Sequence, residues 1–153
     1  MIRTIYIDTS VFGGYFDEEV GSDTEIFFEK IILDNTQIVV SDVLETEIYK
    51  APAFIIDFFE SLKNIERIEL SDIERNLAEK YISEKVVGRT SLVDCQHIAL
   101  ATVANVDVLT SWNFKHIVNL ERIRGYNSIN LREGYRTLEI RTPKEIFDYE
   151  RNR

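Results

Sequence analysis

Cysteine, proline and long apolar runs are scarce in this chain, and each scarcity excludes a class of protein. The single cysteine, Cys95, excludes an internal disulfide and fits a reducing compartment. Apolar runs are short and interrupted by charged residues, so the sequence predicts no transmembrane helix. Asp8 lies where a signal peptide would need its apolar stretch. We therefore expect a cytoplasmic protein with no membrane partner.

Basic residues are also in deficit, with 18 Lys and Arg against 27 Asp and Glu and a formal net charge of −9. Binding a phosphate backbone by charge alone requires clustered Lys and Arg, so the composition argues against that class of protein. The composition is still compatible with a nuclease. Carboxylates that hold Mg²⁺ or Mn²⁺ reverse the local field, and the ions then contact the phosphate.

No repeat, low-complexity tract or linker divides the chain, and its only prolines, Pro52 and Pro143, lie near predicted helix starts. With 153 residues, 44% of them hydrophobic, the chain has enough apolar surface for one core. We expect a single domain over residues 1–153.

Predicted strands alternate with predicted helices along the chain. The patterns predict strands at 2–7, 37–40, 65–70 and 106–110, helices at 22–33, 42–49, 52–62, 72–86, 92–104 and 114–123, late strand segments at Ile129 and 138–140, and a last helix from Pro143. This alternation predicts a three-layer α/β/α fold around a mostly parallel, twisted sheet of about five strands. Ligands bind such sheets beyond the carboxyl ends of the strands, where the strand order reverses.

Carboxylates follow several of these strands. Asp8 comes directly after the first strand, Glu45 and Glu47 lie in the helix after the second, and Asp94 lies in the first turn of a later helix. Mg²⁺ and Mn²⁺ prefer oxygen ligands, and a helix N-terminus favours the ionised form of Asp94. Taken singly, each acid is explained as well by a turn, a cap or a solvated surface. The metal-site hypothesis therefore depends on their convergence in space.

Other chemistries find less support. His97 follows Asp94 on nearly the same helix face, and we expect it to be structural or to support metal ligands from behind; we place His116 on the surface and Cys95 in the core. A zinc site is not predicted, because the chain has no Cys/His ligand set. A G-x-S-x-G elbow, a P-loop and a G-x-G-x-x-G loop are all missing.

In order and spacing, these motifs resemble the PIN-domain family, which includes the VapC-type toxin ribonucleases. The resemblance extends through the whole chain: an apolar strand ending in Asp-Thr-Ser, a Ser that opens a helix with a Glu six residues later, an Asp on an alanine-rich helix, and a fourth strand with its loop. The corresponding segments are Ile5 to Val11, Val40 to Ile48, Asp94 to Ala101 and Asp107 to Ile117.

The resemblance implies that Asp8, Glu47 and Asp94 are the acidic ligands of Mg²⁺ or Mn²⁺. Glu47 has the family's offset from Ser41, and Glu45, two residues earlier in the same helix, is kept in reserve. The implied activity is that of a metal-dependent endoribonuclease, a hydrolase acting on RNA. The implied partners are an RNA substrate, an antitoxin protein if the chain is a toxin, and a second copy of the chain.

The fourth motif departs from the family pattern. The family has one or two Asp residues after the Thr of the fourth strand, whereas this chain has Trp112-Asn113 in a loop one residue shorter. Asn113 takes the fourth catalytic position and offers a carbonyl oxygen to a metal or its water, but it carries no charge. The number of metal ions, one or two, therefore stays open.

Two alternative hypotheses remain. The first is a PIN-like module that has lost catalysis and binds RNA or a partner protein, with Asn113 as its main support. The second is a phosphotransfer enzyme or receiver-like domain, which also places an Asp beyond a parallel strand. A phosphatase of the haloacid-dehalogenase type expects Asp-x-Asp at that point, and here the second position is Ser10. A receiver expects an Asp to phosphorylate after the third strand, where Ser71-Asp72 starts a helix.

Overall fold

The sheet consists of five strands that all run parallel to one another. The computed structural model describes residues 2–152, and side chains as far as Glu150. Within this part the strand order is β3-β2-β1-β4-β5, and every neighbouring pair is parallel. The strands are β1 (Thr4–Ile7), β2 (Gln37–Ser41), β3 (Ile65–Ile68), β4 (Val108–Thr110) and β5 (Ile140–Arg141).

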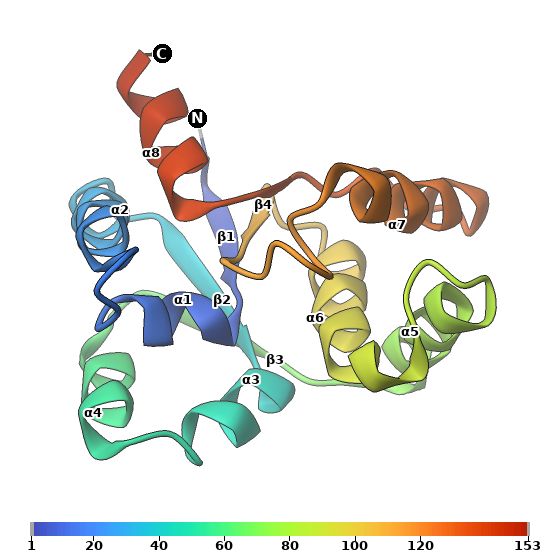
Figure 1. Cartoon of the computed structure of the whole chain (residues 1–153), viewed down its shortest axis with the longest axis horizontal. Coiled ribbons are helices and arrows are strands. Elements are labelled where there is room, and N and C mark those ends of the chain that lie inside the picture. The colour runs from blue at the N-terminus through green and yellow to red at the C-terminus, as the bar shows by residue number, and fades with distance from the viewer. Residues whose placement is uncertain (1, 153) are drawn as a thin grey trace.

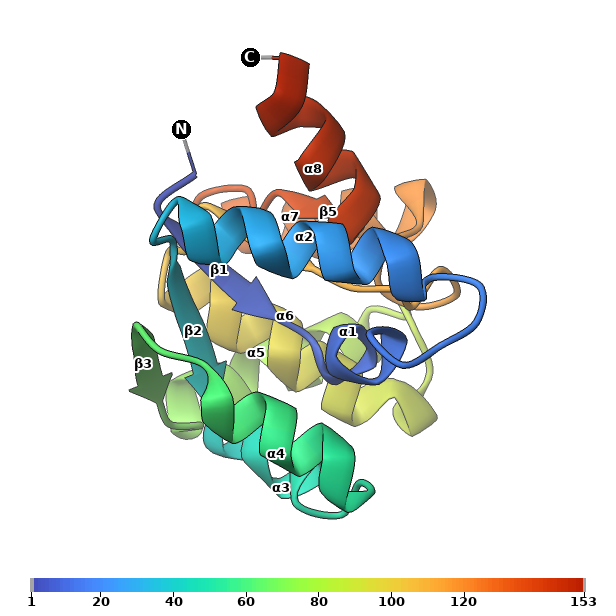
Figure 2. The same ribbon diagram turned by 90° about the vertical axis from the view of Figure 1, so that its left-hand side faces the viewer.

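Helices cover both faces of this sheet, which confirms the predicted three-layer α/β/α fold. Figure 1 shows α1, α2 and α4 on one side of the strands and α5, α6 and α7 on the other. Figure 2 shows the first of these faces, with α2 and α8 side by side above α1 and α4. The helices are α1 (Thr9–Gly14), α2 (Gly21–Leu33), α3 (Asp42–Ile48), α4 (Ala53–Ser61), α5 (Asp72–Ser83), α6 (Leu92–Val103), α7 (Leu120–Arg132) and α8 (Pro143–Asn152), with a short 3₁₀ turn η1 (Arg89–Ser91) before α6.

Alternating side chains of the central strands build two hydrophobic cores. In β1, Ile5 and Ile7 join the core beneath α1, α2 and α4, whereas Tyr6 joins the core beneath α5, α6 and α7. β2 and β4 divide their side chains in the same way. This period of two is the geometry of a strand buried on both faces. Asp8, two residues after Tyr6, is thereby directed towards the α6 side of the sheet.

The order of the strands reverses between β1 and β4, since the chain builds outward through β2 and β3 before returning to β4 on the other side of β1. Asp8 extends the pairing of these two strands by donating its backbone N–H to the carbonyl of Thr110 at 3.0 Å. The carboxyl ends of β1 and β4 are therefore the switch point at which such sheets bind ligands.

Most predicted helices are present, but the segment from Phe114 to Ile123 is not one helix. Residues 114–118 form turns, in which the carbonyl of Asn113 accepts hydrogen bonds from Ile117 and Val118. The helix begins only at Leu120, where the Asn119 side chain accepts from the backbone N–H of Arg122. The assignment of Ile129 to a strand was also wrong, because this residue is buried in α7.

Two helix starts lie directly after strands. Ser71 and Glu74 form a capping box at the start of α5, after β3. Thr9 and Ser10 form the first turn of α1, with Asp8 as the N-cap residue but without a side-chain capping hydrogen bond. Between residues 2 and 152, no helix combines the length and apolar character needed to cross a bilayer.

Gly14, at the end of α1, permits close contact with the loop after β4. A Cβ on Gly14 would lie 2.7 Å from Trp112 Cδ1, whereas a Cβ on Gly13 meets nothing within 4 Å. We expect Gly14→Ala to lower the free energy of unfolding by about 1–3 kcal/mol through overpacking. Gly13→Ala should leave it unchanged or raise it by up to about 1 kcal/mol, as for a helical Gly→Ala change. Urea unfolding measures both; equal stabilities would contradict the prediction.

Candidate functional site

The carboxylate of Asp8 is held by hydroxyl groups from two elements. Ser10 at the start of α1 and Ser111 after β4 both donate hydrogen bonds to Asp8 Oδ2, at 2.7 and 2.8 Å. Ser10 in turn accepts from the backbone N–H of Trp112 at 3.0 Å. Asp8 is only 5% exposed, and among the described residues no hydrogen bond to its other oxygen, Oδ1, is formed. This oxygen is therefore free to bind a ligand.

Glu47, and not Glu45, faces Asp8. Glu47 Oε1 accepts hydrogen bonds from Thr9 Oγ1 and lies against His97 Nε2, both at 2.6 Å. Glu45, on a different side of α3, pairs with Arg67 of β3 at 2.5 Å. The geometry therefore brings Glu47 to the end of β1 and leaves Glu45 in a surface ion pair.

Asp94 reaches the same region through Asn113. The amide nitrogen of Asn113 lies 3.5 Å from Asp94 Oδ2, and its backbone N–H donates to Ser111, which holds Asp8. The side-chain oxygen of Asn113 accepts from the backbone N–H groups of Lys115 and His116. This oxygen thus shapes the turn after β4, instead of being open to a metal or its water as expected from the sequence. We refer to Asp8, Glu47 and Asp94 together as the carboxylate site.

Behind the carboxylate site lies a buried chain of polar groups, of which the sequence analysis names only His97. His97 Nε2 is 2.6 Å from Glu47 and 3.7 Å from Asp8 Oδ1, and its Nδ1 is 2.6 Å from the hydroxyl of Tyr6. Tyr6 is also hydrogen-bonded to Ser41, at 2.7 Å. A tyrosine two residues before Asp8 in a buried strand was the available signal, because a buried phenol needs a hydrogen-bond partner.

Burial and mutual repulsion shift the acid–base properties of these groups. Burial and the negative charge of Asp8 raise the pKa of Asp94. Both effects act against the helix N-terminus, which the sequence analysis expects to favour the ionised form. Burial alone would raise the pKa of Glu47, but the hydrogen bond and charge of His97 lower it overall. Burial alone would lower the pKa of His97, but Glu47 and Asp8 raise it overall.

The donor chemistry of the carboxylate site fits a hard divalent cation. Asp8 Oδ1, Glu47 Oε2 and Asp94 Oδ1 accept no hydrogen bond from the described residues, and ionised oxygens of this kind are the ligands that Mg²⁺ and Mn²⁺ prefer. Among the described residues, no group of three or more His, Cys, Asp or Glu side chains could hold a metal ion in the arrangement that the structure shows. A cation at the carboxylate site would therefore need further ligands, and Mg²⁺ usually keeps several waters and is bound by one or two carboxylates together with substrate phosphates.

The burial of Cys95 agrees with the expectation from the sequence, whereas that of His116 does not. Cys95 is buried, as expected of a core residue. His116 is half-buried instead of lying on the surface, and its Nδ1 is buried without a hydrogen-bond partner among the described residues. The backbone carbonyl of His116 accepts from the hydroxyl of Tyr126, which ties the loop after β4 to α7.

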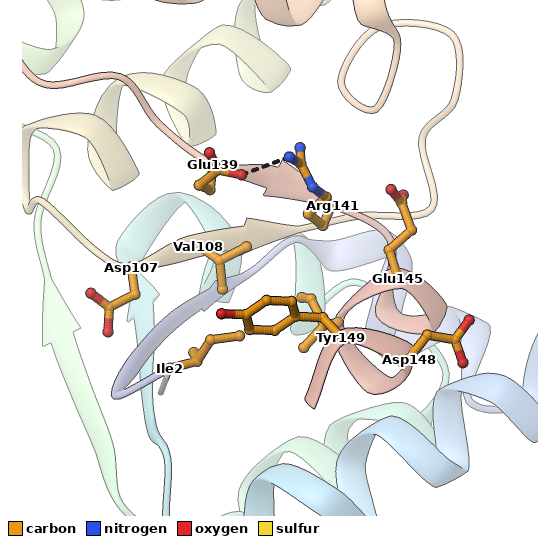
Figure 3. A pocket seen from close by; sticks show the side chains of 9 residues that line it. Ile2, Asp107, Val108, Glu139, Arg141, Glu145, Asp148 and Tyr149 are labelled. Atoms are coloured by element: carbon orange, nitrogen blue, oxygen red, sulfur yellow. Dashed lines mark ion pairs between the residues drawn. The ribbon is translucent and has the colours of Figure 1, made fainter. Parts of the chain in front are cut away.

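A separate cavity of about 640 Å³ lies between α8 and the strands β4 and β5. Figure 3 shows Tyr149, Glu145 and Asp148 projecting from α8 on one side of this cavity, and an ion pair between Glu139 and Arg141 on the other. None of the three carboxylates of the carboxylate site lines it. The cavity is therefore distinct from the carboxylate site.

Comparison with known proteins accounts for this arrangement. The family model described as the PIN domain matches residues 5–113, so the chain belongs to the PIN-domain family, whose members are generally nucleases. No curated protein sequence matches significantly. Among solved structures, VapBC2 from Rickettsia felis bound to a DNA fragment from their promoter superposes with a TM-score of 0.59 at 16% identity, covering 91% of this chain and 98% of that one. DNA-bound VapBC from Salmonella typhimurium superposes with a TM-score of 0.55 at 15% identity, covering 94% and 99%.

The raised pKa of Asp94 predicts how the metal-free protein responds to pH. Because the unfolded chain releases the Asp94 proton more readily than the folded one, this side chain favours folding below its unfolded pKa, and that contribution is lost as the pH rises through the folded pKa. Asp94→Asn removes the charge and should make the metal-free protein more stable than wild type at neutral pH, with the difference vanishing below about pH 4.

Urea unfolding in the presence of a chelator, repeated across pH, measures this effect. Asp57→Asn, on the exposed face of α4, is the control and should change stability little at any pH. Lower stability of Asp94→Asn than of wild type at neutral pH would contradict the prediction.

Proposed function

We propose that this protein is a metal-dependent nuclease, specifically an endoribonuclease that hydrolyses RNA phosphodiesters with Mg²⁺ or Mn²⁺. The observation that carries the proposal is the convergence of Asp8, Glu47 and Asp94. It is supported by two links: His97 contacts both Asp8 and Glu47, and Asn113 joins Asp94 to Ser111, which donates to Asp8. Each of the three acids has an oxygen that accepts no hydrogen bond from the described residues. Membership of the PIN-domain family supports the nuclease class.

In this proposal, Asp8, Glu47 and Asp94 hold the cation. When bound, a divalent ion in such a site lowers the pKa of water and stabilises charge on the phosphate. Asp8 is oriented for this role by Ser10 and Ser111, and Glu47 by Thr9 and His97. Asn113 is the fourth residue of the proposed site. Its amide nitrogen faces Asp94, where it donates a hydrogen bond without adding charge.

RNA as substrate is supported by the surface of the loop after β4. Phe114 is 58% exposed, contacts the ring of Trp112, and is followed by the exposed Lys115, for which no ion pair is formed among the described residues. Exposed aromatic rings beside a cation suit single strands, because bases stack on the rings while the cation attracts the backbone. With a net charge of −9, the protein would depend on this local surface and on the metal for its affinity.

We also propose a role as the toxin of a toxin–antitoxin pair. The structures of VapBC from two bacteria share the fold at low identity, which motivates a search for an antitoxin partner of this chain. A homodimer, a cytoplasmic location and a single domain over residues 1–153 likewise remain predictions. Co-purification with the product of an adjacent gene would test the partner.

Cleavage of a labelled single-stranded RNA in Mn²⁺ tests the nuclease proposal directly. Asp8→Asn and Glu47→Gln should each lower the rate by roughly 100-fold or more, because metal-ion stabilisation of phosphoryl charge is worth several kcal/mol. Glu45→Gln is the matched control. It removes an acid from the same helix, but one that pairs with Arg67, and should keep activity. Equal cleavage by wild type and Asp8→Asn would contradict the proposal.

A second candidate function, a PIN-like module that binds RNA or a protein without cleaving, is favoured by Asn113 alone. If the missing acid limits metal binding, Asn113→Asp should bind Mn²⁺ more tightly and raise cleavage by about tenfold, since each added ligand charge strengthens cation binding. Calorimetry and the same cleavage assay measure both effects. A wild type that binds RNA but never cleaves it, even after Asn113→Asp, would favour the second candidate.

A further inference from the structure

We propose that His97 is a positioning residue, which Tyr6 holds in place and which holds the carboxylate of Glu47 in its cation-binding orientation. The inference rests on the proposed function, since Glu47 is one of its metal ligands. It goes beyond that function because it assigns a role to two buried residues that do not themselves contact the cation or the substrate.

Apart from His97 and Thr9, few contacts restrict the orientation of the Glu47 side chain. It lies near the end of α3, a helix of 7 residues, and its side chain is 37% exposed. A glutamate has several rotatable bonds, and ordering such a side chain costs conformational entropy. His97 Nε2 and Thr9 Oγ1 both bond to the same carboxylate oxygen, Oε1, at 2.6 Å. Two bonds on one oxygen orient the group and leave Oε2 free.

His97 is itself fixed from the opposite side. Its Nδ1 lies 2.6 Å from the Tyr6 hydroxyl, and that hydroxyl lies 2.7 Å from Ser41 Oγ, which accepts from the backbone N–H of Leu44 at 3.1 Å. Tyr6 and Ser41 are fully buried and His97 is 1% exposed, so water does not compete for these bonds. The chain of bonds runs from the first turn of α3, through β2 and β1, to α6 and back to α3 at Glu47.

The position of the ring hydrogen follows from this geometry. A bare nitrogen facing a carboxylate oxygen at 2.6 Å would be repulsive, so Nε2 carries a hydrogen and donates it to Glu47. The Tyr6 hydroxyl bonds to Nδ1 as donor or acceptor, and Ser41 takes the complementary role. Groups that orient metal ligands through such bonds are generally worth about 10–100-fold in metal affinity.

His97 also contacts two acids of the site at once. Its Nε2 is 3.7 Å from Asp8 Oδ1 as well as 2.6 Å from Glu47 Oε1. In this proposal the buried ring restrains the two carboxylates relative to each other. The spacing needed for a shared cation would thus be maintained before the cation binds.

Mn²⁺ binding to the chelator-treated protein, measured by calorimetry and electron paramagnetic resonance, tests this inference without an activity assay. We expect Tyr6→Phe and His97→Leu each to weaken Mn²⁺ binding about tenfold or more. His97→Gln, whose amide still offers a donor, should bind more tightly than His97→Leu. Tyr81→Phe is the matched control. It removes another buried tyrosine hydroxyl of the same core, bonded to Asn130, and should bind Mn²⁺ as wild type does.

A spectroscopic measurement on the wild type separates positioning from direct ligation. Electron spin-echo envelope modulation of bound Mn²⁺ should show no coordinated histidine nitrogen, since Nε2 bonds to Glu47. A coordinated nitrogen that disappears in His97→Gln would overturn the proposal, as would Mn²⁺ affinities of Tyr6→Phe and His97→Leu equal to wild type. If the wild type binds no Mn²⁺, the proposed function fails and this inference fails with it, a result distinct from equal affinities.

Discussion

Three carboxylates brought to one end of the sheet repel one another, and the groups around them offset that repulsion. Asp8 receives two serine hydroxyls, and Glu47 receives Thr9 and His97. Asp94 receives only a long contact from Asn113, and burial together with the charge of Asp8 raises its pKa. A site of this kind favours a bound cation over the metal-free state, because the cation removes the repulsion that folding imposes.

The carboxylate site is built almost entirely on strand ends and helix starts. Asp8 is both the last residue paired with β4 and the N-cap residue of α1, so one backbone position directs the carboxylate and the two hydroxyls that follow it. The carboxyl ends of parallel strands lie along one edge of the sheet. The reversal of strand order beside β1 leaves room for a ligand at that edge. The fold thus supplies the framework for the chemistry proposed here, and the identity of the side chains at that edge decides it.

Secondary structure was predicted most reliably where local sequence patterns are strong, and least reliably where a single hydrogen-bonding residue determines the conformation. The capping box at Ser71 and the parallel sheet follow from short-range propensity and from alternating elements. The conformation of the segment after β4 cannot be predicted from propensity or from the alternation of elements. Its apolar residues suit a helix, but the oxygens of Asn113 accept hydrogen bonds from the backbone N–H groups of residues 115–118, and the helix begins only at Leu120. Such a bond depends on where Asn113 lies, which propensity does not encode.

The sequence by itself determined the order of elements, the family resemblance and the acids most suited to a metal, because these depend on spacing along the chain. Only the tertiary structure distinguishes the surroundings of Glu45 from those of Glu47, because distant segments bring them different neighbours: Arg67 for one, Thr9 and His97 for the other. The structure alone likewise revealed the link from Tyr6 to His97. These residues are 91 positions apart in the chain, and their bond exists because β1 and α6 pack face to face in the buried core.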